Sequence, residues 1–371
     1  MIELEPRLSR EKAELVALCC LPSLTYKMLL DLLCAFGTPA GAWAAIESGD
    51  APSAMDTPAP WEDFARGTEP RSVIESMKES GIEVVVLTEE GYPSRLADID
   101  RPPFAIFYKG RLPDEAPAVA VVGSRKATPY GIEASRSLGC GLALAGVTVV
   151  SGAAHGIDSF AHIGALDAGG RTVAVLGCGP DIAYPPSSAK LLARIARTGC
   201  VMSEYPPGFQ PTRYTFPDRN RIIAGLSLGV VVVEASQKSG ALITSDYGAA
   251  YSREVMAVPG PVFCSNSTGS NGLIRSGAAL IRNHNDVLDE LGLARTISPQ
   301  ASRFGEDESR QGLLAALAAG TRDVDELSRT AELSSAETLV ALCSLEMEGL
   351  ARRGPGGCFE VTAAGYQAAR R

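Results

Sequence analysis

Glycine and basic side chains stand together at four points where an apolar, β-branched run gives way to a helix-like segment. Glycine has no Cβ, so backbone N–H groups at such turns can approach a bound group closely. The N-terminus of each following helix adds partial positive charge, and the combination attracts phosphate. The candidate residues in the four turns are Gly123, Ser124, Arg125, Lys126, Thr128, Ser151, Gly152, His155, Gly156, Gly177, Gly179, Lys238, Ser239 and Gly240.

Glycine-rich turns also occur in doubly wound proteins for no other reason than tight turning. Four such turns in succession, three of them with basic side chains, favour a different interpretation. The sequence therefore predicts an anion-binding crevice for a ligand that carries phosphate.

A second candidate cluster is Arg219, Asn220 and Arg221, which stands directly before an apolar pair. Arginine binds phosphate through two parallel N–H donors and stacks on bases, and asparagine offers both a donor and an acceptor. The other interpretation is a helix start whose arginines pair with internal carboxylates such as Glu204 or Glu234. The residue types alone leave both interpretations open.

The sequence lacks the motifs of several enzyme classes. Arg125 and Thr128 occupy positions where the dinucleotide fingerprint Gly-x-Gly-x-x-Gly requires glycine, so a nicotinamide enzyme is not expected. The phosphate-binding motif Gly-x-x-x-x-Gly-Lys-Ser/Thr is absent from the sequence. The letters Gly-x-Ser-x-Gly occur at residues 225–229, but they precede an expected strand, whereas a nucleophile elbow follows one. Asp158 is interpreted as an N-terminal helix cap rather than a base, and His162 as a structural residue. No catalytic set is predicted.

Charge is distributed unevenly along the 371 residues, whose net charge is −9. Residues 1–116 hold 11 basic against 20 acidic side chains, whereas residues 117–294 hold 14 against 12. The acidic total argues against indiscriminate nucleic-acid binding, but the middle segment can still form a local basic groove. Aromatic residues make up 6% of the chain, so any base-stacking platform is expected to be small.

Nine scattered cysteines include no Cys-x-x-Cys pair, and there are three histidines, so no metal site is expected. Such thiols are typical of a reducing compartment. The N-terminus has no signal-peptide pattern, and no stretch approaches the ~20 apolar residues of a membrane span. We expect a cytoplasmic protein without a membrane segment or a cofactor.

Hydrophobic periodicity divides the chain into three parts. Residues 9–47 have a helical period that predicts about three short helices, and a further helix is expected at 70–79. From residue 82, short β-branched runs alternate with helix-like segments, which is typical of a parallel, doubly wound sheet. The expected strands are 82–87, 104–108, 119–122, 147–151, 172–176, 229–233 and 255–258, and the expected helices between them are 130–145, 158–168, 187–198 and 241–252. Three helices at 310–319, 323–330 and 334–348, followed by a glycine-rich extended end, have the pattern of a winged helix.

A series of motifs, in order along the chain, resembles the DNA-processing protein A (DprA/Smf) family. They are residues 123–131, 151–158, 161–162, 170–179, 203–208, 216–227, Ser239-Gly240 with Thr244, and 258–261. The resemblance implies an extended Rossmann-like domain that binds single-stranded DNA, usually as a homodimer. It also implies that the protein shields incoming strands in natural transformation and helps to load the RecA recombinase. The family is not known for an enzymatic reaction.

The resemblance carries the family's DNA-contacting arginine over to Arg125, and further basic positions to Lys238 and to Arg219 or Arg221. This chain has His155 where relatives often have arginine, so charge there is expected to depend on pH. The family's N-terminal domains resemble SAM or helix-hairpin-helix modules, whose hairpin commonly reads Gly-Ile-Gly. Residues 22–27 lack that hairpin, so a structural or partner-binding role is expected for residues 9–47.

The third helix of the expected winged helix contains three glutamates and neither lysine nor arginine. A recognition helix for the major groove normally offers basic or amide side chains. Arg352 and Arg353 fall at the wing, where they could touch a phosphate. We therefore expect a protein-interaction or dimer-support module rather than a second DNA reader.

Together these observations predict an α/β protein with an extended Rossmann-like, mostly parallel sheet. The expected limits are a helical domain at 1–75, the sheet domain at 76–295, a linker at 296–308 and a winged helix at 309–371. The expected function is non-catalytic binding of single-stranded DNA in the crevice. The alternative is a phosphoribohydrolase-like nucleotide-binding enzyme of the lysine-decarboxylase-like Rossmann group, whose motif Pro-Gly-Gly-x-Gly-Thr with a following Glu is missing at residues 239–244.

Overall fold

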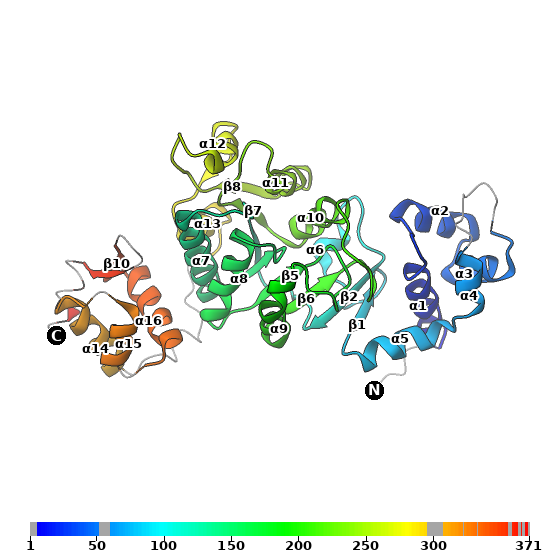
Figure 1. Ribbon diagram of the computed structural model, residues 1–371, viewed down its shortest axis with the longest axis horizontal. Coiled ribbons are helices and arrows are strands. Elements are labelled where there is room, and N and C mark those ends of the chain that lie inside the picture. The colour runs from blue at the N-terminus through cyan, green and yellow to red at the C-terminus, as the bar shows by residue number, and fades with distance from the viewer. Residues whose placement is uncertain are drawn as a thin grey trace.

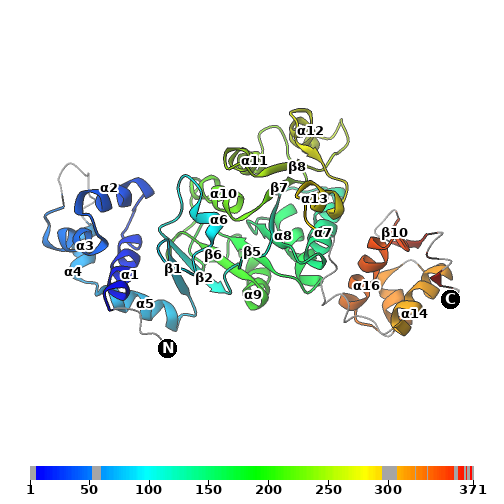
Figure 2. The ribbon, with the colours of Figure 1, turned by 180° about the vertical axis from the view of Figure 1, so that it is seen from behind.

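Three structural parts follow one another along the chain in this computed structural model (Figure 1, Figure 2). The structure describes residues 6–51 and 60–294 and, within 307–369, all but residues 322, 332, 355–357, 363–364 and 366–367. The helices α1–α5 lie at one end, the sheet and its covering helices lie in the middle, and α14–α16 lie at the other end. Most of the expected 48–60 loop and 296–308 linker fall outside the described residues.

Nine strands form the central sheet in the order β1-β2-β6-β5-β4-β3-β7-β8-β9. The strand β2 (Ala105–Gly110) pairs antiparallel with β1 (Glu83–Val86) and with β6 (Cys200–Ser203), and every other pair is parallel. The remaining strands are β3 (Ala118–Val122), β4 (Thr148–Ser151), β5 (Thr172–Val175), β7 (Gly229–Val232), β8 (Glu254–Ala257) and β9 (Ala279–Leu280). The mostly parallel, doubly wound sheet predicted from the sequence is confirmed. The strands β6 and β9 were not predicted, because β6 contains a single β-branched residue and β9 only two residues.

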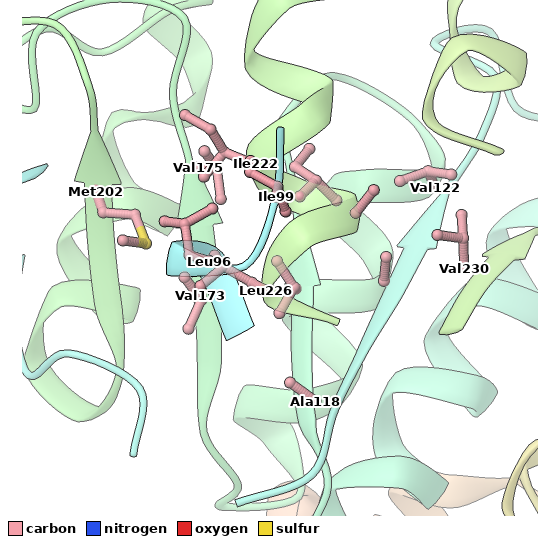
Figure 3. Close-up of a cluster of buried hydrophobic side chains, with 14 of the residues drawn as sticks. Leu96, Ile99, Ala118, Val122, Val173, Val175, Met202, Ile222, Leu226 and Val230 are labelled. Carbon is pink, nitrogen blue, oxygen red and sulfur yellow. The ribbon is translucent and has the colours of Figure 1, made fainter. Parts of the chain in front are cut away.

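Helices cover both faces of the sheet, since successive strand residues point to opposite sides. Val119 and Val121 face α7 (Pro129–Leu144), α8 (Ile157–Asp167) and α13 (His284–Glu290). The alternate residues of β3 face α6 (Ser94–Ala97) and α10 (Thr215–Leu226), as Figure 3 shows for the side chains around Ile222. The helices α9 (Ala189–Thr198) and α11 (Gly240–Ala250) complete the two layers. Because both faces are apolar and buried, the strands read as continuous β-branched runs in the sequence.

The strand order reverses between β3 and β7. From β3 the chain proceeds outward through β4, β5 and β6, and it then returns to place β7 on the other side of β3. In open α/β sheets, ligands bind beyond the carboxyl ends of the strands at such a reversal. The turns that follow β3 and β7 are therefore neighbours in space although about 100 residues separate them.

The N-terminal helices are α1 (Pro6–Cys19), α2 (Tyr26–Phe36), α3 (Pro39–Ser48), α4 (Pro60–Arg66) and α5 (Pro70–Glu79). Their apolar faces pack on the β1–β2 hairpin in one cluster that includes Leu18, Trp43, Trp61, Val84 and Phe107. No single described helix is long and apolar enough to cross a bilayer. The helices α2 and α3, which meet at an angle of 96°, together reach the length and apolar composition of a membrane span. The boundary expected after residue 75 falls within α5, and the domain limits stay a prediction.

The winged helix consists of α14 (Asp307–Ala318), α15 (Val324–Thr330), α16 (Ser335–Met347), β10 (Ala351–Arg353) and β11 (Phe359–Val361). Its third helix packs on the central domain, where Val340 and Cys343 of α16 contact Cys140 and Leu144 of α7. The other short elements are η1 (Pro186–Ser188), η2 (Ser265–Ser267) and α12 (Thr268–Arg275). Like α4, α6 and α13, they were not predicted from the sequence.

Both wing arginines are paired with carboxylates. Arg353 forms an ion pair with Glu133 of α7, and Arg352 donates to Glu360 at 2.8 Å on the neighbouring strand. Each guanidinium already has a carboxylate partner, and contact of these arginines with a phosphate stays a prediction.

The contact between α7 and α16 leads to a prediction about two thiols. Cys140 and Cys343 are both buried and unbridged, and their Sγ atoms are 3.1 Å apart. Treatment with diamide, which takes one hydrogen from each thiol, should therefore join them in one chain as a disulfide. Peptide mapping under non-reducing conditions should find the linked pair, and Cys343→Ser should abolish it. Recovery of Cys140 unlinked after full oxidation would contradict this placement of the winged helix.

Candidate nucleic-acid interface

A cleft of about 730 Å³ lies at the switch point of the sheet, beyond the ends of β3 and β7. Loops from both strands, the start of α10 and the start of α11 form its walls. The predicted residues that line it are Gly123, Ser124, Arg125, Lys126, Arg219, Asn220, Ser239 and Gly240. A smaller hollow that shares Arg125 and Arg219 with the cleft adds Gly152 and His155. Three of the four turns predicted to bind an anion, those after β3, β4 and β7, therefore converge on one site.

Buried Glu234 holds the first of these turns in place. Its carboxylate accepts a hydrogen bond from the Thr128 hydroxyl and a second one, at 2.9 Å, from the Thr128 backbone N–H. Its backbone carbonyl accepts from the N–H of Ser124 at 2.7 Å. A Cβ at Gly131 would lie 2.4 Å from the Glu234 carboxyl carbon, so glycine is required there for the approach. The turn after β3 is thus clamped to the end of β7.

This clamp corrects two expectations. Thr128 does not line the cleft, because its hydroxyl donates to Glu234 and also accepts from Gly131 as the N-cap of α7. Glu234 does not pair with an arginine of the 219–221 segment. Its partner is Thr128, a residue that the sequence marked only as a candidate ligand contact.

Arg125 and Lys126 are the exposed cations of the clamped turn. Neither forms an ion pair with any carboxylate of the part of the chain that the structure describes. The Arg125 guanidinium carbon lies 5.2 Å from the centre of the Phe216 ring, a cation–π distance. A rigid backbone therefore presents two unpaired positive charges at the cleft.

Arg219 is a buried part of the cleft floor. Its Nη1 donates to the carbonyl of Gly152 at 2.9 Å and also to that of Val175. Burial lowers the pKa of Arg219 to about 10, and nearby Asp158 opposes that shift, so the side chain is still a cation at neutral pH. Its charge acts on the cleft from beneath, while its hydrogen bonds hold the turn after β4.

Asp158 does not cap its helix as expected. The N-cap of α8 is Gly156, which has no side chain, and Asp158 Oδ2 accepts instead from the N–H of Gly152 at 3.2 Å. Burial raises the pKa of Asp158, and Arg219 and three backbone N–H groups oppose the rise. His162 is structural, as predicted, since its Nδ1 lies 2.6 Å from the Thr172 hydroxyl. Burial lowers the pKa of His162 to about 3, so the ring is neutral.

Arg221 points away from the cleft, although it stands two residues from Arg219. Its side chain is 0% exposed and pairs with Glu204, the carboxylate named as its alternative partner from the sequence, and more distantly with Asp218. Burial raises the pKa of Glu204, and the charge of Arg221 opposes the rise. Asn220 faces the cleft and donates to the carbonyl of Gly240 at 3.2 Å, which ties α10 to the start of α11.

Five other candidates also lie outside the cleft. The Ser151 hydroxyl is buried and donates to the carbonyl of Val121, and Lys238 is exposed on the β7–α11 loop without lining the cleft. At the other three positions glycine allows close packing, because an added Cβ would clash with a neighbour. The neighbour is the turn after β3 for Gly156, the start of α10 for Gly177 and the carbonyl of Pro206 for Gly179. Glycine at these turns is therefore not by itself a sign of ligand contact.

Aromatic side chains at the cleft were not predicted. Tyr184 and Phe216 lie with ring centres 5.3 Å apart, and both line the cleft. Arg213 also lines it, with its guanidinium 4.6 Å from the ring centre of exposed Tyr214. The adjacent residues Arg213 and Tyr214 in a polar loop were the sequence feature from which an aromatic contribution to the cleft could have been predicted. The prediction that any base-stacking platform is small stays a prediction.

Two family models match this chain. Residues 83–292 match the family described as DNA recombination-mediator protein A, and residues 298–357 match the DprA winged helix domain. A putative DNA processing protein DprA of Mycobacterium tuberculosis H37Rv is 42% identical over 266 residues, which are 70% of this chain and 68% of that protein.

Two solved structures are similar to this chain. DNA processing protein A of Streptococcus pneumoniae superposes with a TM-score of 0.63 at 33% identity, over 76% of this chain and 97% of that one. DNA processing protein A of Helicobacter pylori, studied for its single-stranded DNA binding mode, has a TM-score of 0.51 at 29% identity, over 57% and 95%.

The Glu234 clamp can be tested by substitution. Glu234→Ala should destabilise the protein by about 1–3 kcal/mol, because the Thr128 hydroxyl and N–H lose their buried acceptor. Urea unfolding measures the change. Glu234→Gln keeps one acceptor oxygen and should be milder, so equal losses in the two variants would contradict the clamp.

The buried Arg221–Glu204 pair gives a second stability prediction. Arg221→Met should cost about 3–5 kcal/mol, because it leaves Glu204 buried without its partner. The double variant Arg221→Met, Glu204→Gln should recover much of that loss, since no uncompensated charge remains. Thermal unfolding of the three proteins tests this, and a double variant no more stable than Arg221→Met would overturn it.

Proposed function

The chain belongs to the DNA recombination-mediator protein A (DprA/Smf) family, and on that premise we propose that its cleft binds single-stranded DNA without cleaving it. The observation that carries the proposal is the pair of unpaired cations on the clamped turn, Arg125 and Lys126, beside the Phe216 ring. This arrangement offers charge for phosphate and an aromatic face for a base.

Phosphate binding is supported by the ends of three helices. The starts of α8, α10 and α11 contribute Asp158, Phe216 and Gly240 to the lining of the cleft. Helix N-termini carry partial positive charge and are ready-made sites for phosphate groups. Arg219 adds charge beneath them, and Arg125, Lys126 and Arg213 add charge at the surface. With four cations against the one carboxylate of Asp158, the lining of the cleft carries net positive charge in a chain whose net charge is −9.

A single strand is favoured over a duplex because the cleft combines these charges with aromatic rings. Tyr184 and Phe216 can stack on a base only when that base is not already stacked in a double helix. Phosphate contacts alone do not distinguish the two forms of DNA so sharply. The Helicobacter pylori relative is described as having a single-stranded DNA binding mode, which supports this choice.

We extend the proposal to partners and cellular role. The chain would form a homodimer, shield incoming strands in natural transformation and help to load RecA. The family's description as a recombination mediator supports a recombinase partner. Self-association is supported by the outer edge of β9, where the sheet ends and Leu280 is exposed. The cytoplasmic location stays a prediction.

Replacement of Arg125 tests the proposal. Arg125→Ala should weaken binding of an oligothymidylate and flatten the log–log salt dependence by about 0.7, the value for one phosphate contact on a single strand. Fluorescence anisotropy at several salt concentrations measures both effects. The matched control is Arg197→Ala, an exposed arginine in the last turn of α9, near the edge where the parallel strands begin.

Several outcomes would count against the proposal. An unchanged affinity and slope in Arg125→Ala would remove this residue from the site. Equal affinity for single- and double-stranded oligonucleotides would remove the role of the aromatic pair. Release of adenine from AMP by the purified protein would favour the nucleotide-hydrolysing alternative.

A further inference from the structure

The loop between β8 and η2 exposes two adjacent apolar side chains. Phe263 is 101% exposed and Val262 is 76% exposed, and they are the most exposed large apolar side chains of the residues that the structure describes. A single exposed apolar residue needs no explanation, whereas adjacent ones at the edge of a binding cleft are typical of a contact surface.

The backbone of this loop is firmly held. The Tyr130 hydroxyl donates to the carbonyl of Pro259 at 2.8 Å, and the Asn271 side chain both accepts from and donates to the backbone of Gly260. Cys264 N–H donates to the carbonyl of Pro261 at 3.0 Å. Phe263 therefore stands in solvent on a supported loop, and little conformational entropy would be lost in ordering that loop on binding.

The loop is continuous with the cleft. Asn266, three residues after Phe263, lines the cleft, and its Nδ2 donates to the carbonyl of Lys126 at 2.7 Å. Tyr130, which holds the other end of the loop, belongs to the first turn of α7 directly after the clamped turn. A strand that leaves the cleft past Lys126 consequently meets Asn266 and then the exposed loop.

The charge of this region suits a polyanion. No aspartate or glutamate occurs between residues 255 and 285, whereas the chain as a whole holds 43 of them. A phosphate backbone would meet no carboxylate of this segment. The basic side chains of this segment are those of Arg275, at the end of α12, and Arg282, which pairs with Asp286.

We propose that the Val262–Phe263 tip is a second nucleotide-binding surface, on which Phe263 stacks against a base of single-stranded DNA as the strand leaves the cleft past Asn266. This inference rests on the proposed function, since the strand must first occupy the cleft. It adds a subsite outside the glycine-rich turns, and it explains why a supported loop displays an aromatic ring in a segment without aspartate or glutamate.

Oligothymidylates of increasing length test the proposal in the full-length protein. Short oligonucleotides that fill only the cleft should bind wild type and Phe263→Ala equally. Longer ones should bind wild type more tightly, and Phe263→Ala should lose that gain, which we expect to be about fivefold to tenfold for one stacked base. Phe263→Trp should retain the gain. Leu30→Ala, an exposed apolar residue of α2, is the matched control.

Phe263→Trp also provides a direct signal. The two natural tryptophans, Trp43 and Trp61, are buried in the N-terminal helices. Long oligonucleotides should therefore quench the fluorescence of the exposed indole at position 263 and leave that of the buried pair unchanged. Short oligonucleotides should leave the emission at position 263 unchanged. Quenching that is equal for both lengths would overturn the proposed position along the strand.

Failure of this inference is distinguishable from failure of the proposed function. If Phe263→Ala matches wild type at every length while Arg125→Ala still weakens binding, the tip is not a subsite and the cleft stands. If wild type binds no oligonucleotide, both ideas are overturned. If Phe263→Ala alters only the molar mass measured by light scattering, the tip is a contact between copies of the chain, which also overturns the inference.

Discussion

The hydrogen bonds between buried Glu234 and Thr128 hold together the two turns on which the site depends. Parallel strands bring their carboxyl ends to one edge, but that alone does not fix the loops that follow them. Here the end of β7 supplies a carboxylate to the turn after β3, at the reversal of strand order. With its backbone held, the turn can present Arg125 without first ordering itself around a ligand.

The segment 219–221 shows how one short motif serves two purposes. Arg219 lies under the cleft and donates hydrogen bonds to the carbonyls of Gly152 and Val175. Arg221 instead forms a buried ion pair with Glu204. Asn220, between them, joins α10 to α11. These contacts place the floor of the cleft on packed helices rather than on loops, which makes the shape of the site a property of the core.

Surface charge and apolar exposure divide the molecule in a consistent way. The acidic N-terminal helices pack on the far β1–β2 edge of the sheet, and the wing arginines of the C-terminal domain are bound to carboxylates. Unpaired cations and exposed aromatic rings are found at the switch-point cleft and the loops beside it. The charge of the cleft would thus draw a polyanion to this region of the protein.

Local patterns in the sequence determined most of the sheet, the covering helices α7, α8, α9 and α11, the winged helix and the turn that carries Arg125, because periodicity, β-branching and glycine are properties of short segments. The covering helices α6 and α13 were not predicted. These patterns could not assign Thr128, Arg221 or Gly177. Side chains two residues apart on a helix do not share a face, and a glycine that admits a neighbouring helix looks the same as one that admits a ligand. Only the tertiary structure decided which charged side chains are paired and which remain unpaired at the cleft. The reason is that the partners of the paired side chains lie far away in the chain.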